Sequence, residues 1–392
     1  MIHYVFTILP SLVVLFWLIL FIIESKTSNL PKRFMIFFLV FMLVNYVVHS
    51  LYFNYYYQAY IYLDFIWVLT SLSAYPLYYY YIRLLTVDKK VDFKWIWILV
   101  PALTLSIFTF VVYLLMSPYE IDTFIHEVLY HNRVSNEEYS LLINLQKVRI
   151  NLFKFIFGVQ VFLVFLFGFR LINRFNKRVC SFYSNVENRE MSKIRTLLIF
   201  LLLASIVSVI SNFIGKDYFT DYPYLLALPS ITHSIVLFGI SYVGYKQHFT
   251  IIDLCEDTSI EGQKDDVADV VISEGLVGDE YDLLFMKIEE LFEKQQVYKD
   301  TDLRMNEIAM RLGTNRTYVS RLIHNRTNLS FCDFVNNYRV KHAEEMLSSP
   351  DASSISMEEV ALESGFSGTS SFYRAFQKKN GIPPGKYRKQ KV

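Results

Sequence analysis

The chain has 392 residues and a formal charge of +1, and 53% of its residues are hydrophobic whereas only 19% are charged. This composition excludes an ordinary soluble protein, which is less apolar and more highly charged. The net charge is uninformative because it averages a basic, an acidic and a mildly basic region. Long apolar runs occupy residues 1–247 and the rest reads as soluble sequence, so we predict a boundary near residue 248.

The first part of the chain is predicted to be a polytopic bundle of about seven membrane-spanning helices. A segment of about 20 apolar residues crosses the ~30 Å hydrocarbon core of a bilayer. The segments that meet this requirement are residues 4–23, 34–53, 61–82, 95–116, 152–172, 195–214 and 222–245. The third and the seventh carry the weakest signal.

Basic residues predict the orientation of these spans. Lysine and arginine gather in the first, third and fifth loops, around residues 26–33, 83–94 and 170–195, and are sparse in the other loops. Basic loops stay on the cytoplasmic side of a membrane. We therefore expect a multi-pass protein of the bacterial cytoplasmic (inner) membrane, with its N-terminus outside and its C-terminal domain in the cytoplasm.

Four polar side chains within these spans are candidates for function, because ionisable groups are rare in a bilayer. Asn45 and His49 can instead form hydrogen bonds between helices, and Asp64 can reach the membrane interface. We keep His49 and His233 as candidate sensing residues, with a purely structural role as the alternative.

An acidic linker is predicted over residues 248–279. From residue 249 to 280 there are ten acidic residues against one basic residue, Lys264, and no apolar periodicity, so we expect a flexible tether. The three cysteines, Cys180, Cys255 and Cys332, fall on the predicted cytoplasmic side, where disulfides are rare. We expect them to be reduced and to bind no metal, because their spacing matches no metal site.

Residues 280–392 are predicted to form a soluble all-helical domain. Apolar positions at helical spacing indicate a first helix over 281–296. A short helix then ends at Gly313, and Asn315 is placed to cap a second helix over 316–325. Helix, glycine turn and helix form the helix-turn-helix motif that reads DNA.

The same motif recurs about 50 residues later. The turn contains Gly365, and the helix that follows runs from about Thr369 to Lys379. An amphipathic helix over 331–348 lies between the two motifs and spans ~27 Å at ~1.5 Å per residue. Such a rod can hold two reading helices near the ~34 Å that separates successive major-groove faces on one side of DNA.

Residues 284–388, about a quarter of the chain, resemble the DNA-binding domain of the AraC/XylS family of transcription regulators. The family pattern appears in Ile308-Ala309, Val319-Ser320-Arg321-Leu322, Tyr338-Arg339 with Lys341 and Ala343, Val360-Ala361, Gly365-Phe366, Ser371-Phe372-Tyr373-Arg374-Ala375-Phe376, Gly381-Ile382-Pro383-Pro384 and Tyr387-Arg388. The resemblance implies two helix-turn-helix units in adjacent major grooves. Three positions depart from the pattern, namely Ile323, His324 and Asn328, and none is disabling.

The expected DNA-binding residues lie on the second helix of each unit. The resemblance places base-facing positions at Thr317, Ser320 and Arg321 and at Thr369, Ser370 and Arg374, with Arg316 and Ser371 beside them. Both Arg321 and Arg374 suit bidentate pairing with guanine. Residues 301–392 hold 14 basic and 9 acidic residues, a difference of +5, and we assign phosphate contacts to Lys378 and Lys379.

The leading hypothesis is a transcription regulator that couples a membrane or extracytoplasmic signal to promoter binding. The alternative is a membrane receptor or transporter whose tail is a protein-interaction module. We expect the protein to have no enzymatic activity and to bind no cofactor, because the sequence has no phosphate-binding glycine loop, metal-ligand spacing or nucleophile motif. The expected partners are double-stranded promoter DNA and membrane lipid, with RNA polymerase and a second copy of the chain as further candidates and the signal ligand unknown.

Overall fold

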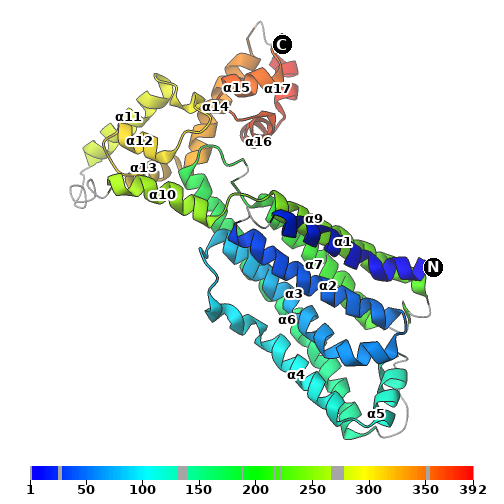
Figure 1. Ribbon diagram of the computed structural model, residues 1–392. Coiled ribbons are helices and arrows are strands. Elements are labelled where there is room, and N and C mark those ends of the chain that lie inside the picture. The colour runs from blue at the N-terminus through cyan, green and yellow to red at the C-terminus, as the bar shows by residue number, and fades with distance from the viewer. Residues whose placement is uncertain are drawn as a thin grey trace. The chain divides into compact units, whose positions relative to one another are not determined.

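A computed structural model describes residues 2–24, 29–130, 139–187, 189–214, 218–219, 222–265, 278–349 and 354–391. Every regular element in these ranges is a helix, which confirms the predicted all-α fold. The chain forms two compact units (Figure 1). One consists of Met1–Ile172 with Met191–Ile251, and the other of Asn173–Glu190 with Ile252–Val392. Residues 173–190 thus belong to the C-terminal unit, although the residues on both sides of them in the sequence belong to the first unit.

The first unit is built from long helices. They are α1 (Ile2–Glu24), α2 (Leu30–Phe53), α3 (Tyr57–Thr86), α4 (Val100–Leu115), α6 (Leu141–Phe182), α7 (Ser192–Ile214) and α9 (Ala227–Lys246). Shorter elements join them, namely η1 (Phe93–Leu99), α5 (Pro118–Thr123), η2 (Phe124–Tyr130) and η3 (Pro223–Leu226). Local sequence sets the ends: Asn29 caps α2 by accepting a hydrogen bond from the Lys32 amide, and Pro31 follows within the first turn.

Six helical stretches among the described residues are long and apolar enough to cross a membrane. They are Tyr4–Glu24, Leu30–Phe53, Phe93–Leu115, Leu141–Phe182, Ser192–Ser211 and Tyr224–Thr258. The sequence predicted about seven. The difference is the third segment, which lies in α3: this helix is long enough, but its many tyrosines and Asp64 make it less apolar.

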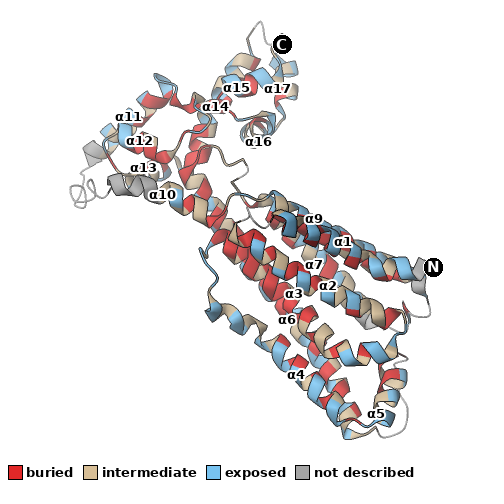
Figure 2. Ribbon diagram, in the orientation of Figure 1, coloured by how far each residue is buried: buried red, intermediate tan, exposed pale blue. Residues whose placement is uncertain are grey.

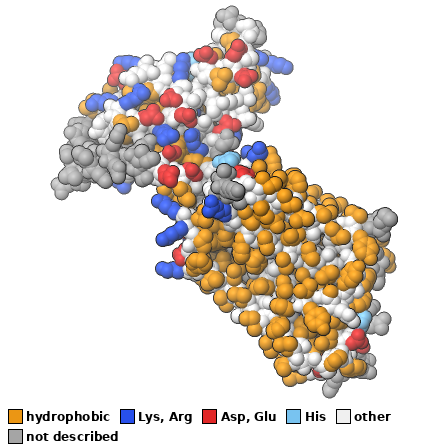
Figure 3. Space-filling model, viewed as in Figure 1, with side chains coloured by type: hydrophobic (Ala, Val, Ile, Leu, Met, Phe, Trp, Pro, Cys, Tyr) orange, Lys and Arg blue, Asp and Glu red, His pale blue; other side chains and the backbone are white. Residues whose placement is uncertain are grey.

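Apolar side chains also cover the surface of this unit. Figure 3 shows hydrophobic residues over nearly the whole visible face of the helical bundle, and Figure 2 shows exposed residues along α1 and α4. On α4 the exposed residues include Ile107, Leu114 and Leu115, each more than half exposed. An apolar surface this extensive is unfavourable in water.

Asp64 does not reach an interface, which corrects the expectation from its position near the end of a span. Its side chain is fully buried, and its carboxylate lies 3.0 Å from the Arg149 guanidinium. The hydroxyls of Tyr60 and Tyr113 also donate to it, at 2.8 and 3.0 Å. The sequence placed Arg149 in a loop and therefore gave no sign of the pair.

The second unit contains the shorter helices. They are α10 (Ile251–Asp265), α11 (Gly278–Glu293), η4 (Val297–Lys299), α12 (Met305–Arg311), α13 (Arg316–Thr327), α14 (Phe331–Leu347), α15 (Met357–Glu363), α16 (Thr369–Asn380) and α17 (Pro384–Lys391). Each helix predicted between residues 281 and 379 is present, with ends shifted by a few residues at most. The predicted tether differs, because its first part is helix α10; residues 266–277 lie outside the described residues.

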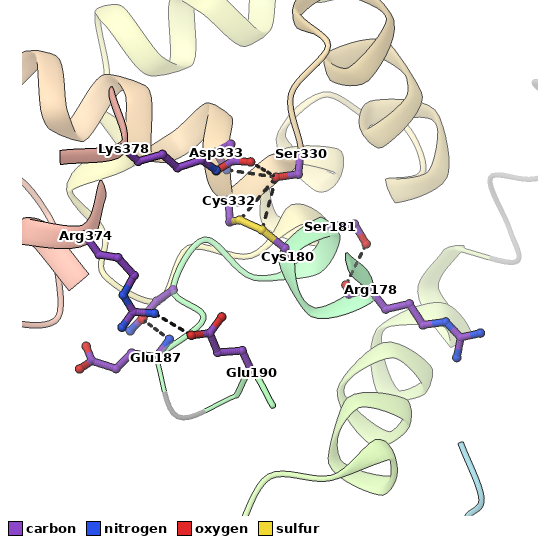
Figure 4. Close-up of a disulfide and its surroundings, with 11 residues drawn as sticks. Arg178, Cys180, Ser181, Glu187, Glu190, Ser330, Cys332, Asp333, Arg374 and Lys378 are labelled. Carbon is purple, nitrogen blue, oxygen red and sulfur yellow. Dashed lines mark hydrogen bonds and ion pairs between the residues drawn. A yellow bond between two sulfur atoms is a disulfide. The ribbon is translucent and has the colours of Figure 1, made fainter. Parts of the chain in front are cut away.

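Two cysteines expected to be reduced are paired. Cys180, near the end of α6, and Cys332, at the start of α14, form a disulfide with their Cα atoms 5.2 Å apart (Figure 4). They are 152 residues apart in the sequence, so only the fold brings them together. Cys255 remains a free thiol, as expected.

Candidate functional site

The first helix-turn-helix unit consists of α12 and α13. Gly313 in the turn has a φ of +65°, a conformation that favours glycine. Asn315 caps α13 as predicted, because its side-chain oxygen accepts a 2.8 Å hydrogen bond from the Tyr318 amide. Val319 and Leu322 are fully buried on the inner face of α13. The opposite face of this helix is therefore turned outward.

The predicted base-facing residues lie on this outward face. Thr317 and Arg321 are exposed, and Ser320 and Arg316 are half-buried. Within the described part of the chain, the Arg321 guanidinium has no ion-pair partner. Arg316 donates a 3.3 Å hydrogen bond to the backbone carbonyl of Thr258 in α10. Arg321 is thus free to meet a ligand, whereas Arg316 is partly engaged by the chain itself.

Helix α14 joins the two units as the predicted rod. Asn328 before it, at one of the three positions that depart from the family pattern, adopts the left-handed conformation with a φ of +58°, which asparagine tolerates. Ser330 then caps the helix through the Asp333 amide. The first half of α14 packs in one core with α11, α12 and α13, and its second half in another with α15 and α16. One helix therefore belongs to both cores.

The second helix-turn-helix unit consists of α15 and α16. Ser356 and Glu359 form a reciprocal capping box at the start of α15. These hydrogen bonds lower the pKa of the Glu359 carboxyl. Gly365 in the turn has a φ of +87°, and a Cβ atom there would lie only 2.4 Å from the Tyr298 carbonyl oxygen. Phe372 and Phe376 are fully buried, so the other side of α16 faces outward.

Three of the predicted residues on α16 are exposed, namely Thr369, Ser370 and Arg374, and Ser371 is half-buried. The Ser371 hydroxyl donates to the Gly368 carbonyl at 2.8 Å, as a side chain in the first turn commonly does. Arg374 is not free: its guanidinium lies 2.6 Å from the Glu190 carboxylate (Figure 4). Nothing in the sequence singles out Glu190, which precedes Arg374 by 184 residues.

The two lysines at the end of α16 lie against α14. Lys378 contacts the Asp333 carboxylate at 2.6 Å, and Lys379 lies 3.4 Å from Glu344 (Figure 4 shows the first pair). Their ammonium groups therefore connect α16 to the rod. The Lys378 side chain is 70% exposed and its charge is open to solvent, so phosphate contact stays a prediction for it.

Arg339, noticed only as part of the family pattern, is a central polar residue of the domain. Its guanidinium is buried and donates to the carbonyls of Tyr298 and Asp300, at 2.7 and 2.6 Å. It also donates to the Ser184 hydroxyl at 3.2 Å. Burial lowers the pKa of Arg339 to about 10, which leaves it charged at neutral pH.

The two candidate sensing histidines line one cavity of the first unit, of about 220 Å³. Aromatic and aliphatic side chains together form most of its wall, and its polar groups include Asn45, Ser71 and Ser208. His233 accepts or donates at both ring nitrogens, with Ser208 Oγ at 2.9 Å and the Pro229 carbonyl at 2.6 Å. Because a carbonyl only accepts, Nδ1 carries the proton and donates to Pro229.

Tyr46 also lines this cavity and was not singled out in the sequence. Its ring makes edge contacts with both histidines, at centroid distances of 6.5 Å to His49 and 6.4 Å to His233. Nothing in the sequence distinguishes Tyr46 from the many other tyrosines of the bundle. Its role comes only from the packing of α2 against α9.

Comparisons with known proteins concern the C-terminal unit. A protein family described as a helix-turn-helix domain matches residues 308–390. Similar proteins include an HTH-type transcriptional regulator, YtdP, of Bacillus subtilis, 33% identical over 24% of this chain and 12% of its own length. The Msm operon regulatory protein of Streptococcus mutans is 32% identical, over 23% of this chain and 31% of its own. The melibiose operon regulatory protein of Escherichia coli is 30% identical, over 23% and 29%.

Among solved structures, the C-terminal domain of AraT, a response regulator from Geobacillus stearothermophilus, is 28% identical over 24% of this chain and 77% of that chain, with a TM-score of 0.22. The chain thus spans less than a third of the length of each of the three relatives it matches. Two helix-turn-helix units joined by one rod, together with the matched residues 308–390, identify the type of domain. The C-terminal domain of this chain therefore belongs to the AraC/XylS family of helix-turn-helix transcription regulators.

Proposed function

We propose that this chain is a membrane-anchored transcription regulator that binds specific promoter sequences through both helix-turn-helix units. The observation that carries the proposal is the pair of exposed arginines, Arg321 and Arg374, at equivalent places on the second helices α13 and α16. Arginine at such positions pairs with the O6 and N7 atoms of guanine. The hydroxyls of Thr317, Ser320, Thr369 and Ser370 add less selective contacts.

Anchoring in a membrane is supported by the first unit. Its apolar surface needs a non-aqueous environment, and a bilayer provides one for helices of this length. The distribution of lysine and arginine along the chain favours a cytoplasmic C-terminal domain, where DNA is accessible. A receptor or transporter with a protein-binding tail would not need an exposed arginine on each second helix.

We assign signal recognition to the cavity lined by His49 and His233. Its wall is mostly apolar and aromatic, with a few converging polar groups, which is the usual composition of a small-molecule site. The ligand class that fits is a small, largely apolar molecule with one hydrogen-bonding group. That end would exchange hydrogen bonds with polar groups of the wall, namely the two imidazoles, the Tyr46 hydroxyl and the Asn45 amide, in place of bonds that some of them make within the protein.

The DNA-binding part of the proposal is tested with the full-length protein in lipid nanodiscs. Duplexes selected from a random pool serve as probes. We expect salt-dependent, sequence-selective binding that Arg321→Ala weakens by about 1–3 kcal/mol. Lys294→Ala, in the turn directly after α11, is the matched control for loss of one positive charge. Equal binding of every duplex, or equal binding by Arg321→Ala and the control, would contradict the proposal.

The sensing part is tested in cells. Expression from a target promoter is compared across growth conditions for the wild type, His233→Leu and His49→Leu, with His126→Leu as a control because that side chain is 45% exposed. We expect the two cavity variants to change the range of expression while leaving DNA binding in nanodiscs intact. An unchanged range in both would remove the cavity from the account.

A further inference from the structure

The end of the long helix α6 and the segment that follows it pack against the helix-turn-helix domain. Val179, Tyr183 and Ser184 are buried in the C-terminal unit. The Ser184 amide donates to the Leu303 carbonyl at 3.1 Å, and Tyr183 pairs with the backbone of Arg304. Burial raises the pKa of the Tyr183 hydroxyl, which donates to Asp257. This part of the chain is therefore seated in the domain.

The turn at the end of this segment brings two carboxylates to the second helix-turn-helix unit. Glu190 contacts the Arg374 guanidinium at 2.6 Å (Figure 4), and Glu187 accepts a 2.8 Å hydrogen bond from the Ser367 hydroxyl. Asn185 and Glu187 also line a recess with Thr369 and Ser370. Three expected base-facing residues of α16 thus lie beside Asn185, Glu187 and Glu190.

The first helix-turn-helix unit differs from the second in the partner of its exposed arginine. Arg321 of α13 has no carboxylate partner in the described part of the chain, whereas its counterpart Arg374 has one. The end of α6 comes near the start of α13, where the Phe182 ring lies 5.9 Å from the Arg316 guanidinium. Among the described residues, a carboxylate therefore pairs with the reading arginine of α16 and not with that of α13.

We propose that residues 183–190 are an inhibitory segment whose binding surface is the DNA-facing side of the second helix-turn-helix unit. A carboxylate held on Arg374 occupies the group that would pair with guanine, and two negative charges at the groove-facing side repel DNA phosphates. The segment and the second half of a binding site then compete for one surface. With the segment in place, the domain reads DNA through its first helix-turn-helix unit alone.

The covalent structure suggests how such a segment would respond to the rest of the protein. Residues 173–182 are the last part of α6, whose other end lies in the first unit. A rearrangement of that helix can therefore displace residues 183–190 from α16. The disulfide between Cys180 and Cys332 attaches the end of α6, directly before this segment, to the rod α14 and favours the covered state.

The experiment uses full-length protein in nanodiscs and a labelled duplex selected from a random pool of about 30 base pairs, three helical turns. Glu187→Gln/Glu190→Gln removes both charges and keeps the side-chain shapes. Glu289→Gln/Glu290→Gln, on α11, changes the net charge equally away from α16 and is the matched control. Affinity is measured together with the protected bases and with amide exchange of the peptide containing Ser184.

Loss of the two charges should raise the DNA affinity of Glu187→Gln/Glu190→Gln about tenfold over that of the control. It should also add protected bases one helical turn from the first protected site. Adding Arg374→Ala should remove the gain. Saturating duplex should increase exchange at Ser184 in the wild type. Equal affinity of the two double variants, or a gain that survives Arg374→Ala, overturns the inhibitory segment.

The inference rests on the proposed DNA binding, and the two fail differently. If the wild type binds selectively through Arg321 and the glutamate variant shows no gain, only the inhibitory segment is wrong. If no variant binds DNA selectively, both proposals are wrong.

Discussion

The guanidinium of Arg149 lies 3.0 Å from the carboxylate of Asp64, and both side chains are buried among the long helices of the first unit. The two residues are 85 positions apart and belong to α6 and α3. Two tyrosine hydroxyls complete the surroundings of the carboxylate, and Gln146 accepts from Arg149 at 2.9 Å. This network ties together three helices, because Tyr113 comes from α4.

Removal of one partner should therefore destabilise the bundle far more than removal of both. We expect Asp64→Leu or Arg149→Leu to lower the free energy of unfolding by about 3–5 kcal/mol, because each leaves a buried charge without its partner. The double variant Asp64→Leu/Arg149→Leu should be more stable than either single variant. Thermal unfolding in detergent measures the three, and additive losses would contradict a coupled pair.

Gly365 should be far less tolerant of substitution than Gly313, although both occupy the turn of a helix-turn-helix unit. Gly365→Ala places a Cβ atom against the Tyr298 carbonyl and should cost about 3 kcal/mol. Gly313→Ala has nothing within 4 Å and should cost only about 1 kcal/mol, for its positive φ. Unfolding of the C-terminal unit measures both, and equal costs would show that the close approach is not limiting.

Arg339 should not be replaceable by lysine. Its guanidinium donates hydrogen bonds to two carbonyls at once, those of Tyr298 and Asp300. The single ammonium of a lysine cannot reproduce that geometry. We expect Arg339→Lys to lower the free energy of unfolding of the C-terminal unit by about 1–3 kcal/mol. Lys341→Arg, on the same helix, provides the reverse substitution as a control. Wild-type stability of Arg339→Lys would contradict the bidentate role.

Salt dependence should separate base contacts from phosphate contacts. Removal of a phosphate contact reduces the slope of log affinity against log salt by about 1, whereas loss of a base contact lowers affinity with little change in slope. We expect Lys378→Ala to show the first behaviour and Arg321→Ala the second. An unchanged slope in Lys378→Ala would instead confine that lysine to its ion pair with Asp333.

The helix-turn-helix units were predictable because their signals are local. Asn315 and Gly313 bracket a turn within three residues, and the inward positions of α13 and α16 recur at helical spacing. Asn328 departs from the family pattern without disabling it, because asparagine tolerates the left-handed backbone found there. Spacing within one or two helices is sufficient for such predictions.

Contacts between distant parts of the chain were not predictable. The pairs Asp64–Arg149, Cys180–Cys332 and Glu190–Arg374 join residues 85, 152 and 184 positions apart. A single sequence states the charge and chemistry of each partner but not its neighbour. The tether was misjudged in its first part for a related reason: Ile251 and Leu254 are buried within helix α10, although acidic residues dominate the surrounding sequence.

The central claim is that one chain reads two successive major-groove faces with Arg321 and Arg374. Hydroxyl-radical footprinting of the full-length protein on a selected duplex, in the Glu187→Gln/Glu190→Gln background, tests it most directly. The account predicts two protected patches about one helical turn apart, one abolished by Arg321→Ala and the other by Arg374→Ala. A single patch, or two patches that both persist in each variant, would contradict it.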